Sequence, residues 1–255
     1  MPNEIITSNK NQIVSKTLDI KKSPSGRIFL EGHRLVFEGL SFGLEPEYFL
    51  IEEGIFDEIS SSHSEILSYP YFVLSKGVFE KICDTKTPQG LAMVAKFNLS
   101  SKSLVQGNFL VLDEIQDPGN LGTIIRSASG TSFRNIILIN CVSPLSQKVV
   151  RSTMGGLFRE NFLIFENSSE FLSFAKEQAL NYYCATMEGQ NVFEMKSKPQ
   201  GNFGIVIGNE GNGVSEALRD SAKGLWSIPM KNGLESLNAG VSAGILMFYM
   251  DNKNC

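Results

Sequence analysis

The residues best suited to chemistry lie in three short polar segments in the second half of the chain. The first segment reads Asp-Pro-Gly-Asn-Leu-Gly-Thr-Ile-Ile-Arg over residues 117–126. Pro and Gly favour a turn, and Asn120 is suited to cap a following helix or to orient a bound group. Arg126 supplies a planar, permanently charged guanidinium that suits a phosphate. A turn with a capping Asn and a solvent-facing Arg is the structural alternative.

Glu210 lies in the second segment, which reads Gly-Asn-Glu-Gly-Asn-Gly over residues 208–213. Three glycines in six residues allow positive φ and close approach of a ligand to the backbone. Their order does not match the G-x-G-x-x-G fingerprint, so a dinucleotide site is not expected. The Glu210 carboxylate could hold a ribose hydroxyl, an arginine or another backbone segment. A plain turn before a helix is the alternative.

The third segment joins Ile-Pro-Met at 228–230 to Glu-Ser-Leu-Asn at 235–238. Ser236 is a candidate N-cap for the helix that we expect over 237–250. Small residues, including two glycines, fill the first turns of that helix and lower its helix propensity. They indicate close approach to a cofactor or another chain, or tight packing on the sheet.

Apolar runs that fit buried strands precede these polar segments or alternate with them. Four runs stand out, at 109–112, 136–139, 162–165 and 204–207. Helices are expected at 121–130, 147–153, 169–179, 215–222 and 237–250. Continuous apolar runs indicate parallel strands covered on both faces, so a doubly wound α/β domain is predicted. Ligands in such folds bind at the carboxyl ends of the strands, where the polar segments begin.

A smaller α/β domain is predicted for the first 98 residues. Strands are expected at 27–30, 48–52, 71–74 and 91–96, and helices at 8–20, 33–42 and 76–83. This alternation is typical of an α/β sandwich. The polar segment 98–103 marks the boundary. We therefore expect an N-terminal domain over 1–98, a linker over about 99–107 and a C-terminal domain over 108–255.

Charge and composition restrict the class of function. The chain has 255 residues, 42% of them hydrophobic, and a net charge of −4. These values are typical of a globular protein and disfavour indiscriminate nucleic-acid binding. Six basic residues lie between Lys10 and Arg34, and no Lys or Arg lies between 35 and 75. One face could therefore be positive, although an ordinary solvated helix and loop would give the same pattern.

The chain carries no recognisable metal, secretion or membrane signal. Its four cysteines are widely spaced, which favours free thiols in a reducing compartment and no metal site. The first residues lack a secretion signal, and no apolar run is long enough to span a bilayer. We therefore expect a cytoplasmic protein without a membrane segment.

Taken in order, the three polar segments closely resemble the signature motifs of the SpoU (TrmH-type) ribose methyltransferases in the SPOUT superfamily. The likeness covers roughly residues 108–251. Segments 29–36 and 87–90 are similar to a substrate-binding domain often fused to these enzymes, which resembles an RNA-binding ribosomal-protein fold. This chain departs from the family where Ala239 and Gly240 replace the usual Val-Ser after Leu-Asn.

The resemblance implies transfer of a methyl group from S-adenosylmethionine (SAM) to a 2′-hydroxyl of RNA. It implies a deep trefoil knot in the C-terminal domain and a homodimer whose last helix contributes to the interface, which completes the site. It places the cofactor against Gly208, Ile228, Met230 and Leu237. It places the reacting hydroxyl among Asn120, Arg126, Glu210, Ser236 and Asn238.

The family's proposed role for the arginine matching Arg126 is that of a general base. A guanidinium stays protonated up to about pH 12, so we instead expect Arg126 to hold a phosphate and to stabilise charge developing on the 2′-oxygen. Proton loss to water or a neighbouring phosphate would then suffice. Ser236 and Asn238 would fix the nucleotide.

Candidate RNA contacts are His33, Arg34, Lys148 and Arg151. An exposed helix start is the alternative interpretation of His33 and Arg34. The added N-terminal domain favours ribosomal RNA over transfer RNA as the substrate. Two other functions are a non-catalytic RNA-binding relative, which Asn120 and Arg126 disfavour, and a nucleotide-dependent oxidoreductase, which the glycine spacing disfavours.

Overall fold

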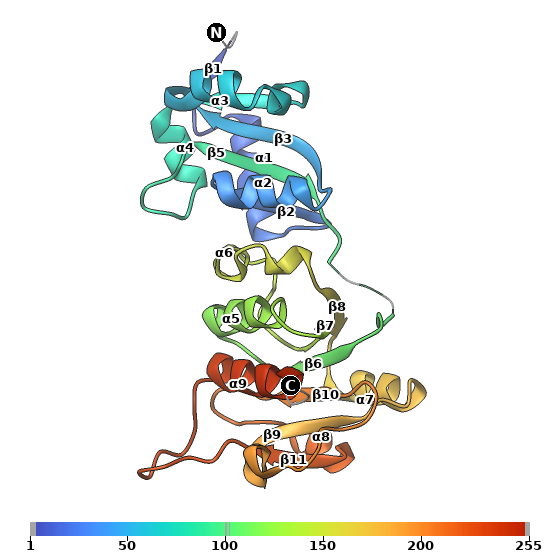
Figure 1. The fold of residues 1–255 in the computed structure, drawn as a ribbon. Coiled ribbons are helices and arrows are strands. Elements are labelled where there is room, and N and C mark those ends of the chain that lie inside the picture. The colour runs from blue at the N-terminus through green and yellow to red at the C-terminus, as the bar shows by residue number, and fades with distance from the viewer. Residues whose placement is uncertain (1–3, 100, 102, 253–255) are drawn as a thin grey trace. The chain divides into compact units, whose positions relative to one another are not determined.

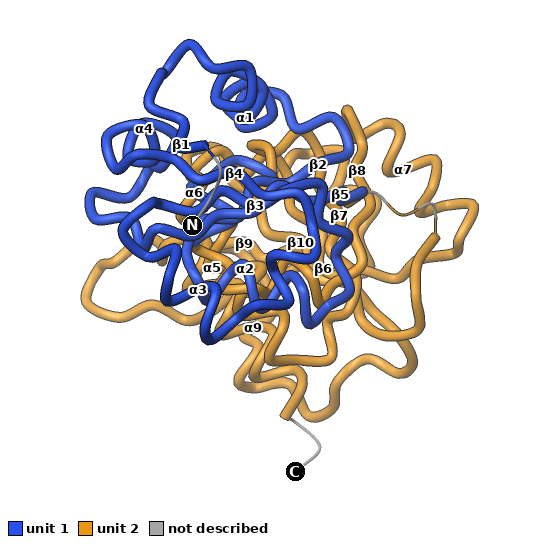
Figure 2. Tube along the Cα trace, turned by 90° about the horizontal axis from the view of Figure 1, so that it is seen from above, with its two compact units in different colours: residues 1–98, 145–151 blue, residues 99–144, 152–255 orange. Residues whose placement is uncertain are grey.

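Two compact units make up the computed structural model, which describes residues 4–99, 101 and 103–252 (Figures 1 and 2). The first unit contains residues 1–98 and the short segment 145–151. The second contains residues 99–144 and 152–255. The segment 145–151 was not expected to group with the N-terminal residues, because the sequence shows only a short helix there.

A five-stranded mixed sheet forms the centre of the first unit. Its strand order is β1-β4-β3-β5-β2, and β5 runs antiparallel to both of its neighbours. The strands are β1 (Ile5–Ile6), β2 (Arg27–Glu31), β3 (Glu45–Glu52), β4 (Tyr71–Leu74) and β5 (Leu91–Lys96). The helices are α1 (Gln12–Lys22), α2 (His33–Ser41), α3 (Phe56–Ser62) and α4 (Lys76–Ile82), with 3-10 turns η1 (Glu53–Ile55) and η2 (Ser64–Ser68).

A six-stranded parallel sheet forms the centre of the second unit. Its strand order is β11-β9-β10-β6-β7-β8, and every neighbouring pair is parallel. The strands are β6 (Asn108–Asp113), β7 (Phe133–Ile139), β8 (Asn161–Phe165), β9 (Tyr182–Asn191), β10 (Gly204–Ile207) and β11 (Gly224–Ser227). The helices are α5 (Pro118–Ala128), α7 (Ser168–Glu177), α8 (Glu216–Ser221) and α9 (Ala239–Asn252), with η3 (Gly156–Phe158) and η4 (Val192–Glu194). Helix α6 (Gln147–Thr153) falls mostly within the segment 145–151 of the first unit.

The predicted α/β class with a parallel C-terminal sheet is confirmed. The apolar runs correspond to strands β6, β7, β8 and β10. The apolar residues of β6, β7 and β10 are buried, whereas the edge strand β8 leaves Ile164 49% exposed. Strand β9 was not predicted, because its residues alternate poorly and its pairing is interrupted. Leu225 of β11 pairs with Cys184, whereas the next residue, Trp226, pairs with Gln190. Residues 185–189 therefore bulge out of the sheet, and such bulges often re-aim side chains near functional sites.

Both predicted helix caps were wrong. Helix α5 begins one turn earlier than expected, and Asp117 caps it by accepting a hydrogen bond from the Asn120 backbone N at 2.8 Å. Helix α9 begins at Ala239, so Ser236 lies before it. Asn238 caps α9, because its Oδ1 accepts bonds from the backbone N of Gly240 at 2.9 Å and of Val241 at 3.3 Å.

Small residues let α9 lie close to α5. A Cβ on Gly240 would lie 3.2 Å from the Thr123 side chain, and one on Gly244 would lie 3.8 Å from Ser127 Oγ. At Gly240 a side chain would push α9 away from α5, since side chains at the contact set the interaxial distance, whereas the distance at Gly244 is ordinary van der Waals contact. Packing against α5 thus explains the glycine at position 240.

Candidate active site

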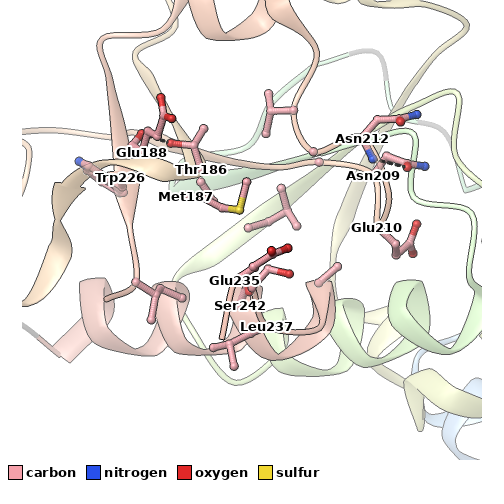
Figure 3. Close-up of a pocket in the computed structure, with 18 of the residues that line it drawn as sticks. Thr186, Met187, Glu188, Asn209, Glu210, Asn212, Trp226, Glu235, Leu237 and Ser242 are labelled. Atoms are coloured by element: carbon pink, nitrogen blue, oxygen red, sulfur yellow. Dashed lines mark hydrogen bonds between the residues drawn. The ribbon is translucent and has the colours of Figure 1, made fainter. Parts of the chain in front are cut away.

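The second unit contains a pocket of about 460 Å³ near the carboxyl ends of β9 and β10. Its walls come from the β9 bulge, the glycine loop 208–213, the segment after β11 and the start of α9 (Figure 3). The pocket is in the size range of small-molecule sites. Its lining includes all four residues predicted to contact a cofactor, namely Gly208, Ile228, Met230 and Leu237.

The glycine loop has a fixed shape that only glycine permits at its start. A Cβ on Gly208 would overlap the backbone carbon of Gly213, well inside van der Waals contact. Asn209 closes the loop by accepting bonds from the backbone N of Gly211 and Asn212. Its own Nδ2 donates to the carbonyl of Glu114 at 2.8 Å, which ties the loop to the end of β6.

Glu210 lines the pocket, and its carboxylate extends to the start of α5. Its carboxylate accepts a bond from Asn120 Nδ2 at 2.9 Å and from the backbone N of Asp117 at 3.3 Å and Gln116 at 3.5 Å. Partial burial alone would raise the pKa of Glu210. The hydrogen bonds from Asn120 and the backbone outweigh burial and hold the pKa below its usual value, so the carboxylate is ionised at neutral pH.

Asn120 connects Glu210 to the third polar segment. Asn120 is 9% exposed, and its Oδ1 accepts a bond from Asn238 Nδ2 at 2.8 Å. One side chain from each of the three polar segments therefore joins a continuous hydrogen-bonded row. Of these, Glu210 and Asn238 line the pocket, while Asn120 lies behind them.

The remaining predicted catalytic residues differ in their placement. Ser236 lines the pocket beside Leu237. Arg126 is exposed on α5 and is not part of the pocket lining. Among the described residues, the structure records no hydrogen bond or ion pair for its guanidinium. The structure thus brings Asn120, Glu210, Ser236 and Asn238 together, and it leaves Arg126 at the surface of a helix that flanks them.

The predicted RNA contacts lie in the first unit. His33 begins α2, where its backbone N bonds Gln89 Oε1 at 3.1 Å, and Arg34 beside it is exposed. Lys148 is exposed on α6. Arg151 is half-buried, and its guanidinium pairs with Asp84 at 3.1 Å.

Asp84 in turn also bonds Lys21 at 3.0 Å. Burial alone would raise the pKa of Asp84, but Lys21 and Arg151 lower it further than burial raises it. Arg151 is therefore already engaged by a protein carboxylate, whereas Arg34 and Lys148 are exposed. His33 is half-buried, and its ring Nε2 lies 3.2 Å from the carbonyl oxygen of Gln89.

Sequence reasoning missed the wall of the pocket formed by Trp226 and the β9 bulge. Trp226 is buried, and its ring stacks on Tyr183 with centroids 4.2 Å apart and planes 8° apart. In Figure 3 it lies at one end of the pocket with Thr186 and Glu188, while Asn209 and Asn212 lie at the other. Trp226 is the single tryptophan of the chain and comes two residues before Ile228, which is the one sequence signal that could have indicated it.

The described residues contain neither a membrane-spanning helix nor a metal cluster. No helix there is long and apolar enough to cross a membrane. The same residues contain no group of three or more His, Cys, Asp or Glu side chains that could hold a metal ion.

Comparison with known proteins gives consistent matches over both units. Residues 107–248 match the SpoU rRNA Methylase family, and residues 18–93 match the MRM3-like substrate binding domain. The chain is 31% identical over 252 residues to the 23S rRNA (guanosine(2553)-2′-O)-methyltransferase RlmP of Bacillus subtilis. That alignment covers 96% of this chain and 98% of the relative. The 23S rRNA (guanosine-2′-O-)-methyltransferase RlmB of Xanthomonas campestris is 31% identical over 54% of this chain and 56% of its own length.

Solved structures show the same fold at lower identity. The AdoMet-bound rRNA methyltransferase from Sinorhizobium meliloti superposes with a TM-score of 0.83 at 23% identity, covering 98% of each chain. The SpoU methyltransferase AviRb from Streptomyces viridochromogenes, in complex with AdoMet, gives a TM-score of 0.84 at 20% identity over 96% of this chain and 98% of that chain.

Proposed function

This chain belongs to the SpoU rRNA methylase family, and from that premise we propose that it transfers a methyl group from SAM to a ribose 2′-hydroxyl of ribosomal RNA. It is a SAM-dependent RNA methyltransferase. One observation on this chain itself supports the proposal. The three polar segments, which are distant in sequence, meet around one pocket. The RNA class comes from the Bacillus and Xanthomonas relatives, both of which are named for 23S rRNA.

The pocket has the size and lining that SAM requires. Its volume of about 460 Å³ suits a nucleoside with an amino-acid tail. Gly208 and Leu237 would present backbone groups, while Ile228 and Met230 supply apolar surface. When bound, SAM supplies an electrophilic methyl group on a positively charged sulfur.

The protein's own contribution is position and charge. Ser236 and Asn238 would hold the target nucleotide so that its 2′-oxygen lies in line with the methyl group, and positioning of this kind can remove several kcal/mol of barrier. Arg126 would bind the adjacent phosphate and stabilise charge developing on the 2′-oxygen. The proton would leave to water or to that phosphate.

A homodimer would explain why Arg126 lies outside the pocket of its own chain. Helix α9 exposes apolar side chains, with Val241 48% and Phe248 45% accessible, and it packs beside α5, which carries Arg126. Exposed apolar side chains gathered on one helix support an interface. We infer that Arg126 serves the pocket of the partner subunit.

Three further features follow from the family and are proposed with it. The segments 208–213 and 228–238 would form the loops of a trefoil knot around the cofactor. His33 and Arg34 would dock RNA on the first unit. The protein would act in the cytoplasm, where ribosomal RNA is modified.

Purified protein with SAM and RNA tests the proposal. We expect calorimetry to detect SAM binding, and we expect the single tryptophan, Trp226, to change fluorescence because it lines the pocket. Mapping of 2′-O-methyl groups in total RNA should show one ribosomal site that is lost from cells without this protein. A protein that binds RNA but not SAM would instead be the non-catalytic relative.

Substitution of Arg126 tests its role. Arg126→Ala should lower the methylation rate by about a hundredfold or more, because a charge-stabilising donor is lost. Arg126→Lys should keep part of the rate, since it keeps the charge but not the planar fork. Lys176→Ala on α7, outside the pocket, is the matched control. Near-wild-type rates in both Arg126 variants would show that the assignment is wrong.

A further inference from the structure

We propose that Asn120 is a positioning residue at the centre of a directional hydrogen-bond relay, through which Glu210 sets the orientation of Asn238 and of the pocket wall at the start of α9. The inference rests on the proposed function, because the wall it controls is that of the SAM pocket. It assigns Asn120 a role that does not require contact with RNA or SAM.

Both polar atoms of the Asn120 side chain are already used. Nδ2 donates to Glu210 Oε1 at 2.9 Å, and Oδ1 accepts from Asn238 Nδ2 at 2.8 Å. Asn120 is 9% exposed and does not line the pocket. A buried amide with two short partners inside the protein is held in place, and it has little capacity left for a substrate group.

The direction of the relay follows from the chemistry of its first member. An ionised carboxylate can only accept hydrogen bonds, so it forces the NH₂ group of Asn120 toward Glu210. The carbonyl oxygen of Asn120 must then face Asn238 and accept from its NH₂ group. Asn238 is left with its oxygen toward α9, where that oxygen accepts from the backbone N of Gly240 and Val241.

Backbone N–H groups, in addition to Asn120, keep the Glu210 carboxylate ionised and therefore able only to accept hydrogen bonds. The backbone N of Asp117 and of Gln116 also point at its carboxylate, at 3.3 Å and 3.5 Å. Hydrogen bonds to a carboxylate favour its ionised form, and the pKa of Glu210 is accordingly lowered. The orientation is thus fixed at both ends of the row: by the Glu210 carboxylate, which can only accept, and by the backbone N–H groups of Gly240 and Val241, which can only donate to Asn238 Oδ1.

The relay links two walls of the pocket through a residue outside it. Glu210 belongs to the glycine loop and Asn238 directly precedes α9; both line the pocket, as do Leu237 and Ser242 near the start of α9 (Figure 3). Breaking the row at Asn120 should therefore change the pocket without removing any atom that lines it. If Asn120 instead acted only by touching the RNA, its substitution would leave the binding of SAM unchanged when no RNA is present.

A charge swap tests the direction. Asn120→Asp places two carboxylates against each other, and Glu210→Gln replaces the obligatory acceptor by an amide. In the double variant, the amide introduced at position 210 would donate to the carboxylate introduced at position 120. That carboxylate would still accept from Asn238 Nδ2. The amide oxygen at position 210, in the place of Glu210 Oε2, would still accept from the Gln116 backbone N, whereas the bond from the Asp117 backbone N to Oε1 would be lost. The relay is therefore rebuilt with the charge moved by one residue.

SAM affinity is the first readout, measured by calorimetry on the full chain. Each single variant should bind SAM about tenfold or more weakly, which is the effect of losing one charge-assisted hydrogen bond. The double variant should recover to within about threefold of wild type, because coupled residues are not additive. Asn140→Asp is the matched control: Asn140 Nδ2 also donates to a glutamate, Glu114, at 3.4 Å, but the pair is exposed and lies outside the pocket.

Thermal unfolding followed by circular dichroism is the second readout, and it needs no SAM. The swap should restore the unfolding temperature that the single variants lose; a single variant that fails to fold while the double variant folds gives the same support. Additive losses in both readouts, or a double variant worse than either single, would overturn the relay. If the wild type binds no SAM, the proposed function fails, and unfolding alone decides the relay.

Discussion

Glu160 shows how burial can turn one side chain into a source of pH-dependent stability. Its side chain is 1% exposed, and the guanidinium of Arg134 lies 3.6 Å away with 56% exposure of its own. Burial raises the pKa of Glu160 to about 7, and the charge of Arg134 and a hydrogen bond from Ser129 only partly oppose it. A group with a raised folded pKa contributes stability that is complete below its unfolded pKa and is lost as pH rises through the folded value.

Glu160→Gln should therefore stabilise the protein at high pH and not at low pH. The folded state holds a proton on Glu160 that the unfolded chain has released above about pH 4.5, so stability should fall between pH 4.5 and 7 in wild type. The gain at pH 8 should be on the order of 2 kcal/mol, within what a pKa shift of this size corresponds to. Unfolding temperatures at pH 5 and 8 measure it. Exposed Glu166→Gln is the control, and equal gains at both pH values would contradict the argument.

At the residue scale, the sequence indicated which residues line the pocket, but it did not indicate the helix caps or the ion-pair partner of Arg151. Gly208, Ile228, Met230 and Leu237 all line the pocket, because motif segments at strand ends must meet at one sheet edge. The capping roles of Asn120 and Ser236 were wrong, because Asp117 and Asn238 are equally good caps and spacing does not choose between them. The partner of Arg151 could not be predicted, since Asp84 is distant in sequence.

At the scale of elements, the buried strands were predictable and the irregular strand was not. Continuous apolar runs leave few alternatives to β6, β7, β8 and β10. Strand β9 carries Thr-Met-Glu-Gly-Gln in its middle, and its pairing with β11 skips residues 185–189. Periodicity cannot detect a strand whose residues leave the ladder, which is why one wall of the pocket was missed.

The turn at the end of β10 should be intolerant of any side chain at Gly208. A Cβ there would overlap the Gly213 backbone, so Gly208→Ala must open the glycine loop. We expect Gly208→Ala to weaken SAM binding by more than about tenfold, as measured by Trp226 fluorescence. Gly211→Ala is the matched control in the same loop, since its Cβ would meet only Asn209 Oδ1 at 3.5 Å. Comparable losses in both variants would count against a specific close approach at Gly208.

The backbone around Val105, just before β6, is held against the sheet by the buried side chain of Asn135. Asn135 is fully buried, and its side chain bonds both the N at 2.8 Å and the O at 3.0 Å of Val105. Asn135→Leu should leave both backbone groups unpaired and cost about 1–3 kcal/mol for each group that stays buried. Limited proteolysis should then cut faster within 103–107, around Val105. Exposed Asn252→Leu should leave the cleavage rate unchanged, and an unchanged rate in Asn135→Leu would show that other contacts hold the segment.

At the scale of the whole molecule, the placement of Arg126 supports the proposed homodimer. Arg126 is exposed on α5 and outside its own pocket, and the neighbouring α9 exposes Val241 and Phe248. A two-fold interface through these helices would bring each Arg126 to the other subunit, because a symmetric contact pairs the same patch on both chains. The proposed mechanism then requires two chains for each site.

Mixed dimers decide this point. Arg126→Ala and Gly208→Ala chains, each strongly impaired alone when SAM is limiting, would be co-expressed with different tags, and the mixed dimer would be isolated through both. If Arg126 acts across the interface, one site combines an intact pocket with an intact arginine, so activity should return to about half of wild type per dimer. If Arg126 acts within its own chain, every site keeps one defect and no activity returns. Failure to isolate any mixed dimer would argue against the dimer itself, and wild-type chains carrying the two tags provide the control for that step.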